Sequence, residues 1–206
     1  MRMSDTDETA SMLQWSSSID ILLAKWCDEA KCFEWMHLQA YTLYESKSRY
    51  LILASNILTS ISGLINLIVG GISIQGFQTS WIFGTISIII SITNMLQEKL
   101  AYSIAATEHK HSAIVWGIIR RKIEEEVAIP PTFRKQCSTF MKLIREDINK
   151  VSLDGNTKIP EFIRQQCYDK FGKIANFDVP DICGSMEHTK IYSDTNDLNT
   201  ALIAIK

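Results

Sequence analysis

The chain has 206 residues, enough for one domain of modest size, with 21 Lys and Arg against 23 Asp and Glu and a formal net charge of −2. This balance, with no run of basic residues, excludes a surface built to bind nucleic acid and gives no signature for anionic lipid. The five cysteines are odd in number and form no CxxC motif, which favours reduced thiols over a disulfide framework.

Residues 1–15 form an acidic start without an apolar core, so we expect this segment to be disordered and to contain no cleavable signal peptide. The serines at 16–18 can cap a helix that the apolar pattern predicts over 18–49. Apolar and aromatic positions recur along it in alternating four- and three-residue steps, as on one side of a coiled coil. They are Ile19, Leu23, Trp26, Ala30, Phe33, His37, Ala40 and Tyr44. Because no Pro or Gly interrupts this helix, we expect it to continue into the next segment.

The segment 50–97 contains no Asp, Glu, Lys, Arg or His over 48 residues, whereas about a quarter of an average domain is charged. Since a membrane-spanning helix needs about 20 mainly apolar residues, the segment predicts two spans at about 50–74 and 79–97. The 13 Ile, Leu and Val residues of the first span favour insertion by about 4–8 kcal/mol. The alternative is a buried hairpin in a soluble bundle, whose helices would normally each show a charged face.

Small and polar side chains are segregated on one side of each predicted span. In the first span they are Ser55, Thr59, Ser62, Asn66, Gly70 and Ser73, with Gly63 at the edge. In the second span they are Ser80, Gly84, Ser87, Ser91, Asn94 and Glu98, and the same spacing continues through Ala101, Ala105, Glu108 and Ser112. In lipid, such residues allow close helix approach and interhelical hydrogen bonds worth about 0.6–2 kcal/mol each.

Two interpretations of these stripes stay open. In the first, they only pack helices together; the helix-packing residues are Ser55, Thr59, Ser62, Gly63, Gly70 and Gly84 in the spans, and Trp26, Phe33, His37 and Ala105 outside them. In the second, part of the polar surface lines a water-filled path in an oligomer. The candidate lining residues are Asn66, Ser87, Ser91, Asn94 and Glu98. In both interpretations the polar faces point away from lipid, so the sequence pattern does not distinguish helix packing from a water-filled path.

The second span is predicted to continue without a break as a helix over 98–128, which ends where Pro130 and Pro131 forbid further helix. An amphipathic helix with one apolar face is predicted over 132–151. That face contains Phe133, Cys137, Phe140, Ile144 and Ile148. Pro160 favours the start of a short helix over 161–171, and residues 176–206 are predicted to form a loosely ordered tail.

The chain has no HExxH, P-loop, GxSxG or GxGxxG motif. We therefore expect neither an enzyme nor a cofactor. If residues 49 and 98 lie level, His37 and His109–His111 fall at similar heights on two antiparallel helices. A metal site there is the alternative, but these spacings are generic for helices. Packing histidines are the expectation, and no metal is predicted.

Four segments in this order resemble the SLATT family of two-transmembrane helical proteins. They are WCDEAKCFEWMHLQAYTLY, LASNILTSISGLINLIVGG, EHKHSAIVWGIIRRKIEEEVAIPPTFR and IPEFIRQQCYDKFGK. The resemblance covers roughly residues 20–175, and the Trp-Met-His and Ile-Pro-Glu segments are similar to forms carried by large DNA viruses. It implies a pore-forming membrane protein, a type proposed in bacteria to be coupled to nucleotide-signalling enzymes. In a viral setting it implies a membrane component of the virion or infected cell.

We therefore expect an all-α membrane protein whose two-helix transmembrane hairpin extends into a cytosolic helical bundle, with residues 16–175 as one SLATT-like domain. Lys47, Arg49 and Lys99 flank the outer ends of the hairpin, so the positive-inside rule predicts that both termini are cytosolic. The expected partners are the lipid bilayer and further copies of the chain, and a nucleotide-signal or viral protein partner stays unidentified. The expected function is a pore or channel-like assembly, and the alternative is a non-conducting structural membrane anchor.

Overall fold

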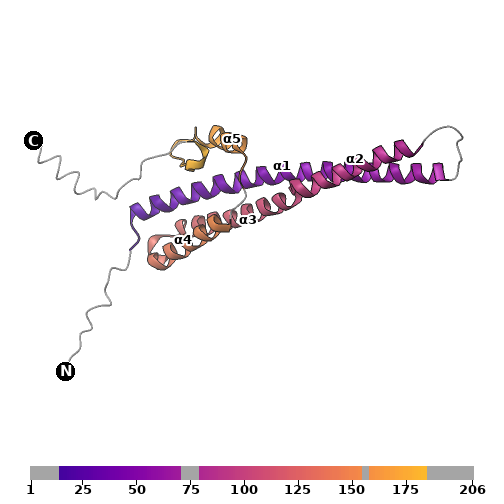
Figure 1. The fold of residues 1–206 in the computed structure, drawn as a ribbon. Helices are drawn as coiled ribbons and strands as arrows, with labels where there is room; N and C mark the ends of the chain where they lie inside the picture. Colours follow the sequence, from indigo (N-terminus) through magenta and orange to yellow (C-terminus); the bar gives the residue numbers. More distant parts are fainter. Residues whose placement is uncertain (1–13, 71–78, 155–157, 185–206) are drawn as a thin grey trace, which may run out of the picture.

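The computed structural model describes residues 14–70, 79–154 and 158–184 (Figure 1). Every regular element in these residues is helical, which confirms the all-α fold class. The elements are α1 (Ser17–Gly70), α2 (Thr79–Leu100), α3 (Tyr102–Val127), the 3-10 helix η1 (Pro131–Phe133), α4 (Cys137–Asp154), α5 (Glu161–Phe171) and the 3-10 helix η2 (Asp181–Cys183). Residues 1–13 of the N-terminus predicted to be disordered, the turn at 71–78 and residues 185–206 of the predicted tail lie outside the described residues, whereas Trp15 is described and its Nε1 donates to the carbonyl of Lys135 at 2.9 Å.

Helix α1 is the element against which the rest of the chain packs. Its 54 residues correspond to a length of about 80 Å at 1.5 Å per residue. Its first bonds run from the N–H groups of Ile19 and Asp20 to the carbonyl of Ser16, within the serine cluster that the sequence marks as a cap. Because no Pro or Gly lies between Ser17 and Ser62, one helix continues from the aromatic pattern into the charge-free segment, as predicted.

Helices α2 and α3 return along α1 in the opposite direction (Figure 1). The prediction that they form one unbroken helix is wrong, because Ala101 between them has φ 44° and ψ 34°. This left-handed conformation costs a non-glycine residue about 1–2 kcal/mol. Local bonds continue across the break, from Ala101 N–H to the Gln97 carbonyl and from Ala105 N–H to the Ala101 carbonyl. The break changes the rotational phase of α3 relative to α2, so the stripe predicted from residue 80 to 112 does not form one continuous face.

The corner between α3 and α4 also differs from the prediction, since α4 begins at Cys137 and not at Thr132. The physical reason is Arg134, whose guanidinium donates to the carbonyls of Val127 (3.0 Å) and Ile129 (2.7 Å) at the end of α3. Its Nη1 also lies 2.6 Å from Asp20 on α1. Arg134 itself has an extended backbone, so the helix cannot begin until this capping residue has been passed.

The main hydrophobic core lies between the N-terminal half of α1, the C-terminal half of α3 and α4. Its buried side chains are Leu23, Cys27, Ala30, Trp116, Ile119, Ile123, Cys137, Phe140, Met141, Ile144 and Val151. The predicted apolar face of α4 is confirmed for Cys137, Phe140 and Ile144, and Ile148 packs at its edge. Phe133 does not belong to this face, because it lies in η1 and is 81% exposed.

A second core joins α5 and η2 to the middle of α1. Its buried residues are Cys32, Met36, Ala40, Ile163, Cys167 and Cys183. The bounds of α5, Glu161 to Phe171, agree with the predicted short helix, and Pro160 precedes its first turn. Helices α4 and α5 therefore lie on different sides of α1 (Figure 1).

No helix in the described part of the chain contains a segment that is both long enough and apolar enough to cross a membrane. The first predicted span includes residues 71–74, which lie outside the described residues. The all-α class is thus the part of the expected fold that the structure shows, and the membrane spans stay a prediction.

Candidate functional site

The charge-free segment forms the paired ends of α1 and α2, and much of its described surface is aliphatic. The exposed large apolar side chains are Ile52, Leu53, Ile57, Ile61 and Leu64 on α1, and Ile88, Ile89, Ile92, Met95 and Leu96 on α2. Contiguous exposed apolar surface of this kind marks contact with a membrane or with another protein. This end of the hairpin is therefore the first candidate site.

A hydrogen bond joins the two polar stripes of the hairpin within the described residues. Ser55 is buried, and its Oγ donates to Oδ1 of Asn94 at 2.7 Å. Ser55 was predicted to pack helices and Asn94 to line a path, and the structure brings the two together. The Asn94 side chain thus takes part in holding α1 to α2 within one chain.

Several other described members of the polar stripes are exposed or lie in open space. Ser87, Ser91 and Glu98 are exposed on α2. A Cβ atom added at Gly63 or at Gly84 would meet nothing within 4 Å. These glycines therefore do not bring α1 and α2 close together within one chain.

On α1, the remaining packing candidates differ: Thr59 is exposed, Ser62 is half-buried, and the side chains of 66–70 lie outside the described residues. Thr59 donates to the carbonyl of Ser55 in its own helix at 2.9 Å, and Ser62 is half-buried. Asn66 and Gly70 belong to the described helix, but the surroundings of their side-chain positions lie outside the described residues.

A pair of histidines forms the second candidate site, in the buried interface between α1 and α3. The Nδ1 atoms of His37 and His109 are 2.9 Å apart, and the two residues are 5% and 0% exposed. One ring must donate and the other must accept, so the accepting ring is neutral and the two rings cannot both be protonated in this pair. Tyr44 stacks on His109 with ring centroids 5.4 Å apart. Nε2 of His109 is buried without a partner among the described residues.

The environment of this pair disfavours protonation. Burial, followed by the neighbouring His109, lowers the pKa of His37 from 6.5 to about 4. Burial also lowers the pKa of His109. His37 and His109, which were expected at similar heights on two helices, are thus in direct contact. This contact joins α1 to α3 outside the charge-free segment. His111, in contrast, is exposed.

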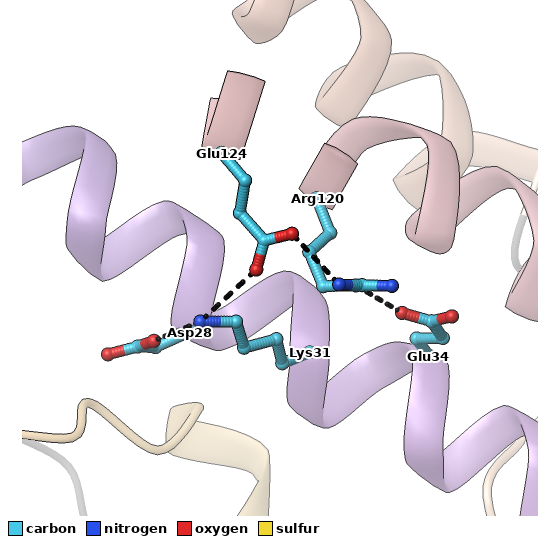
Figure 2. A network of polar contacts seen from close by, with 5 residues as sticks. All are labelled: Asp28, Lys31, Glu34, Arg120 and Glu124. Atoms are coloured by element: carbon cyan, nitrogen blue, oxygen red, sulfur yellow. Dashed lines mark hydrogen bonds and ion pairs between the residues drawn. The ribbon is translucent and has the colours of Figure 1, made fainter. Parts of the chain in front are cut away.

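Five charged side chains connect α1 with α3 beside the main core (Figure 2). Arg120 donates to Glu34 at 2.7 Å and to Glu124 at 2.9 Å. Lys31 lies 3.5 Å from Glu124 and 3.3 Å from Asp28. The hydrogen bond to Glu34 raises the pKa of Arg120, and the charges of Glu34 and Glu124 add to this effect although burial opposes it. Arg120 is therefore a permanent cation between two carboxylates.

Gly117, one turn before Arg120, leaves the space that this network needs. A Cβ atom at Gly117 would lie 2.8 Å from Oε1 of Glu34. Because the charged side chains are partly exposed, each pair contributes only about 0–1 kcal/mol. The network therefore contributes little to the free energy of unfolding, and its main effect is on the alignment of α1 with α3.

The sequence predicts that Trp26, Phe33, Tyr44, Ala105 and Trp116 are largely buried where the helices pair outside the charge-free segment, and the structure buries them to different degrees. Trp116 is 6% exposed and stacks on Phe33, with ring centroids 4.6 Å apart and planes at 12°. Trp26, Phe33, Tyr44 and Ala105 are half-buried. The prediction is thus confirmed for Trp116 and too strong for the others.

Three of the five free, buried cysteines gather with Met36 in the second core, which sequence spacing did not reveal. The Cys183 thiol donates to Sδ of Met36 at 3.6 Å. Hydrogen bonding to Cys183 lowers the pKa of Cys167, but hydrogen bonding to Cys32 and burial raise it more, to about 12 overall. The hydrogen bond to Cys167, together with burial, raises the pKa of Cys183. At neutral pH these groups are thiols, which are unreactive compared with thiolates.

Within the described residues, no group of three or more His, Cys, Asp or Glu side chains is arranged to hold a metal ion. The residues that the structure brings together are therefore a polar bond in the hairpin, a histidine pair and a charged network, all at interfaces of α1. No protein-family model, curated protein or solved structure matches this chain.

Proposed function

We propose that the protein is an integral membrane protein whose hairpin of α1 and α2 associates with further copies in the bilayer to form a pore or channel-like assembly. The observation that carries this proposal is the aliphatic exposed surface of the charge-free hairpin. Burying apolar surface is worth about 25 cal/mol per Å². Lipid tails can bury these aliphatic side chains, and this contact requires no charged partner.

The oligomer follows from the shape of one protomer. Two helices alone cannot enclose water, so conduction requires several hairpins around an axis. Ser87, Ser91 and Glu98 are exposed on α2, and small polar side chains suit contact between helices in lipid. A ring of Glu98 carboxylates at one end of such a path would favour cations.

The resemblance of residues 20–175 to the SLATT family supports the same proposal, with both termini in the cytosol and a viral or host membrane as the location. One specific observation favours the alternative function, a non-conducting anchor. The Ser55–Asn94 bond uses one proposed lining residue to pack the hairpin itself. The two functions make different predictions for the remaining polar residues of α2.

Replacing both Ser87 and Ser91 by Ala is expected to slow ion flux through the assembly without changing its oligomeric state. Glu98→Lys is expected to shift the preference from cations toward anions, because it reverses the charge of the ring. The measurements are ion flux after reconstitution into liposomes and oligomer mass in detergent. Ser60→Ala is a matched control, since Ser60 is an exposed serine on α1 that bonds only to its own helix.

An anchor would give another result. Oligomers that stay impermeable across a range of voltage and pH would contradict the pore and leave the anchor as the better account. Equal ion flux in the Ser60→Ala control and in the variant with both Ser87 and Ser91 replaced would show that these two serines do not line the path.

The proposed topology has its own test. A Cys introduced at Gln78 is expected to react with an impermeant thiol reagent added outside the cell, because the turn carries no Lys or Arg. A Cys introduced at Gln166 is expected to stay protected until the membrane is opened. Gln166 is the better inside marker because it is exposed, whereas the native Cys167 beside it is 0% exposed. The reverse labelling pattern would overturn the orientation.

A further inference from the structure

A cavity of about 500 Å³ lies where α1, α3, α4, α5 and η2 meet. Phe33 and His37 of α1 and Trp116 of α3 line one part of it. Lys158 and Arg164 line another part, beside Ile182 of η2. These residues are far apart in the sequence, and only the docking of α5 onto α1 brings them together.

The charge of this cavity is one-sided. Its lining contains two cationic side chains and no Asp or Glu among the described residues. Neither Lys158 nor Arg164 forms an ion pair within the described chain. The other two partly buried arginines, Arg120 and Arg134, each contact a carboxylate. The cavity therefore holds positive charge that forms no ion pair with the described carboxylates.

Arg164 has a buried donor without an acceptor. Its Nε is buried and has no partner among the described residues, and its Nη1 makes one long bond of 3.3 Å to the carbonyl of Ile182. A buried donor without an acceptor costs about 1–3 kcal/mol, and more when the group is charged. A guanidinium has five N–H donors in a planar fork that matches a carboxylate or a phosphate. An oxyanion beside Arg164 would supply the acceptors that are missing.

The lining also includes two aromatic side chains, Phe33 and Trp116. Phe33 and Trp116 are stacked there with ring centroids 4.6 Å apart. Their aromatic surface suits the hydrophobic body of a ligand, while the cations suit its charged end. We propose that this cavity binds a small organic oxyanion, with its carboxylate or phosphate on Arg164 and Lys158 and its apolar part against Trp116 and Phe33.

This site is independent of whether the assembly conducts, so it is tested by binding alone. The full-length chain, purified in a mild detergent, is titrated calorimetrically at constant ionic strength with phenyl phosphate, benzoate and inorganic phosphate. We expect saturable binding of phenyl phosphate or benzoate that is tighter than that of inorganic phosphate, because only the first two have an apolar body. The tighter of the two identifies whether the charged group is a phosphate or a carboxylate.

The variants assign the binding to this cavity. Arg164→Gln is expected to weaken binding about 10- to 100-fold, as for loss of charge-assisted hydrogen bonds. Lys158→Gln is expected to weaken it as well, and since Lys158 is exposed this change leaves the fold intact. Arg145→Gln is the matched control, because Arg145 is exposed on α4 and does not line the cavity.

Two results would overturn the proposal. One is the absence of saturable heat for all three compounds up to about 1 mM, a concentration that corresponds to binding of about −4 kcal/mol. The other is binding that Lys158→Gln and Arg164→Gln leave as strong as Arg145→Gln does, which would place the ligand elsewhere on the protein.

Discussion

Replacing Trp116 by Ala is expected to lower the free energy of unfolding by about 3–5 kcal/mol, the usual cost of truncating a large aromatic side chain in a core. Trp116 is 6% exposed, belongs to the main core and stacks on Phe33. Its loss would leave a cavity between α1 and α3 that the surrounding helices can only partly close. Denaturant unfolding of the full-length chain, followed by circular dichroism, measures this change.

The matched control is Phe133→Ala, which also truncates an aromatic side chain. Phe133 is 81% exposed in η1, so its loss is expected to change the free energy of unfolding by no more than about 0.5 kcal/mol. Similar losses for the two variants would show that the extension of the hairpin is not a packed bundle.

Acidification is expected to destabilise the folded chain through the His37–His109 pair. The folded-state pKa of His37 is lowered from 6.5 to about 4, so between these values the unfolded chain binds the proton more readily. The free energy of unfolding therefore falls as pH drops from 6.5 to 4 and loses about 3 kcal/mol from His37 alone. His109 acts in the same direction. Unfolding measured at several pH values gives this dependence.

His37→Leu should reduce the slope of stability against pH over this range, because it removes one of the two groups that must bind a proton on unfolding. His111→Gln, which alters an exposed histidine on the same helix as His109, should leave the slope unchanged. A slope that stays the same in His37→Leu would show that the buried pair does not govern the response to acid.

Much of the fold was predictable because its signals are local. The unbroken first helix follows from the absence of Pro and Gly before residue 63, and the bounds of α5 follow from Pro160 and its short apolar pattern. The late start of α4 was not predictable from propensity. It depends on Arg134, which reaches back to the carbonyls at the end of α3 and is held by Asp20, 114 residues earlier in the chain.

In the candidate sites, too, the residue types were predictable from local sequence but their partners were not. Period and polarity identified Ser55 and His37 as packing residues and Asn94 as a candidate lining residue, but not which residues would bond to one another. The partners Asn94 and His109 are set by how α2 and α3 align against α1. The left-handed Ala101 and the cationic cavity at Arg164 carry no local signal, because the first depends on packing and the second on the docking of α5.

The uninterrupted length of α1 has a mechanical consequence. Two of its residues that bond to other helices, His37 and Ser55, are 18 positions apart (55 − 37), or about five complete turns, so they project from the same side of α1. Their partners, His109 and Asn94, are separated by 15 positions (109 − 94), and the Ala101 joint lies between them. A rotation of α1 about its axis would therefore strain both bonds together, whereas α2 and α3 can change their relative orientation at Ala101.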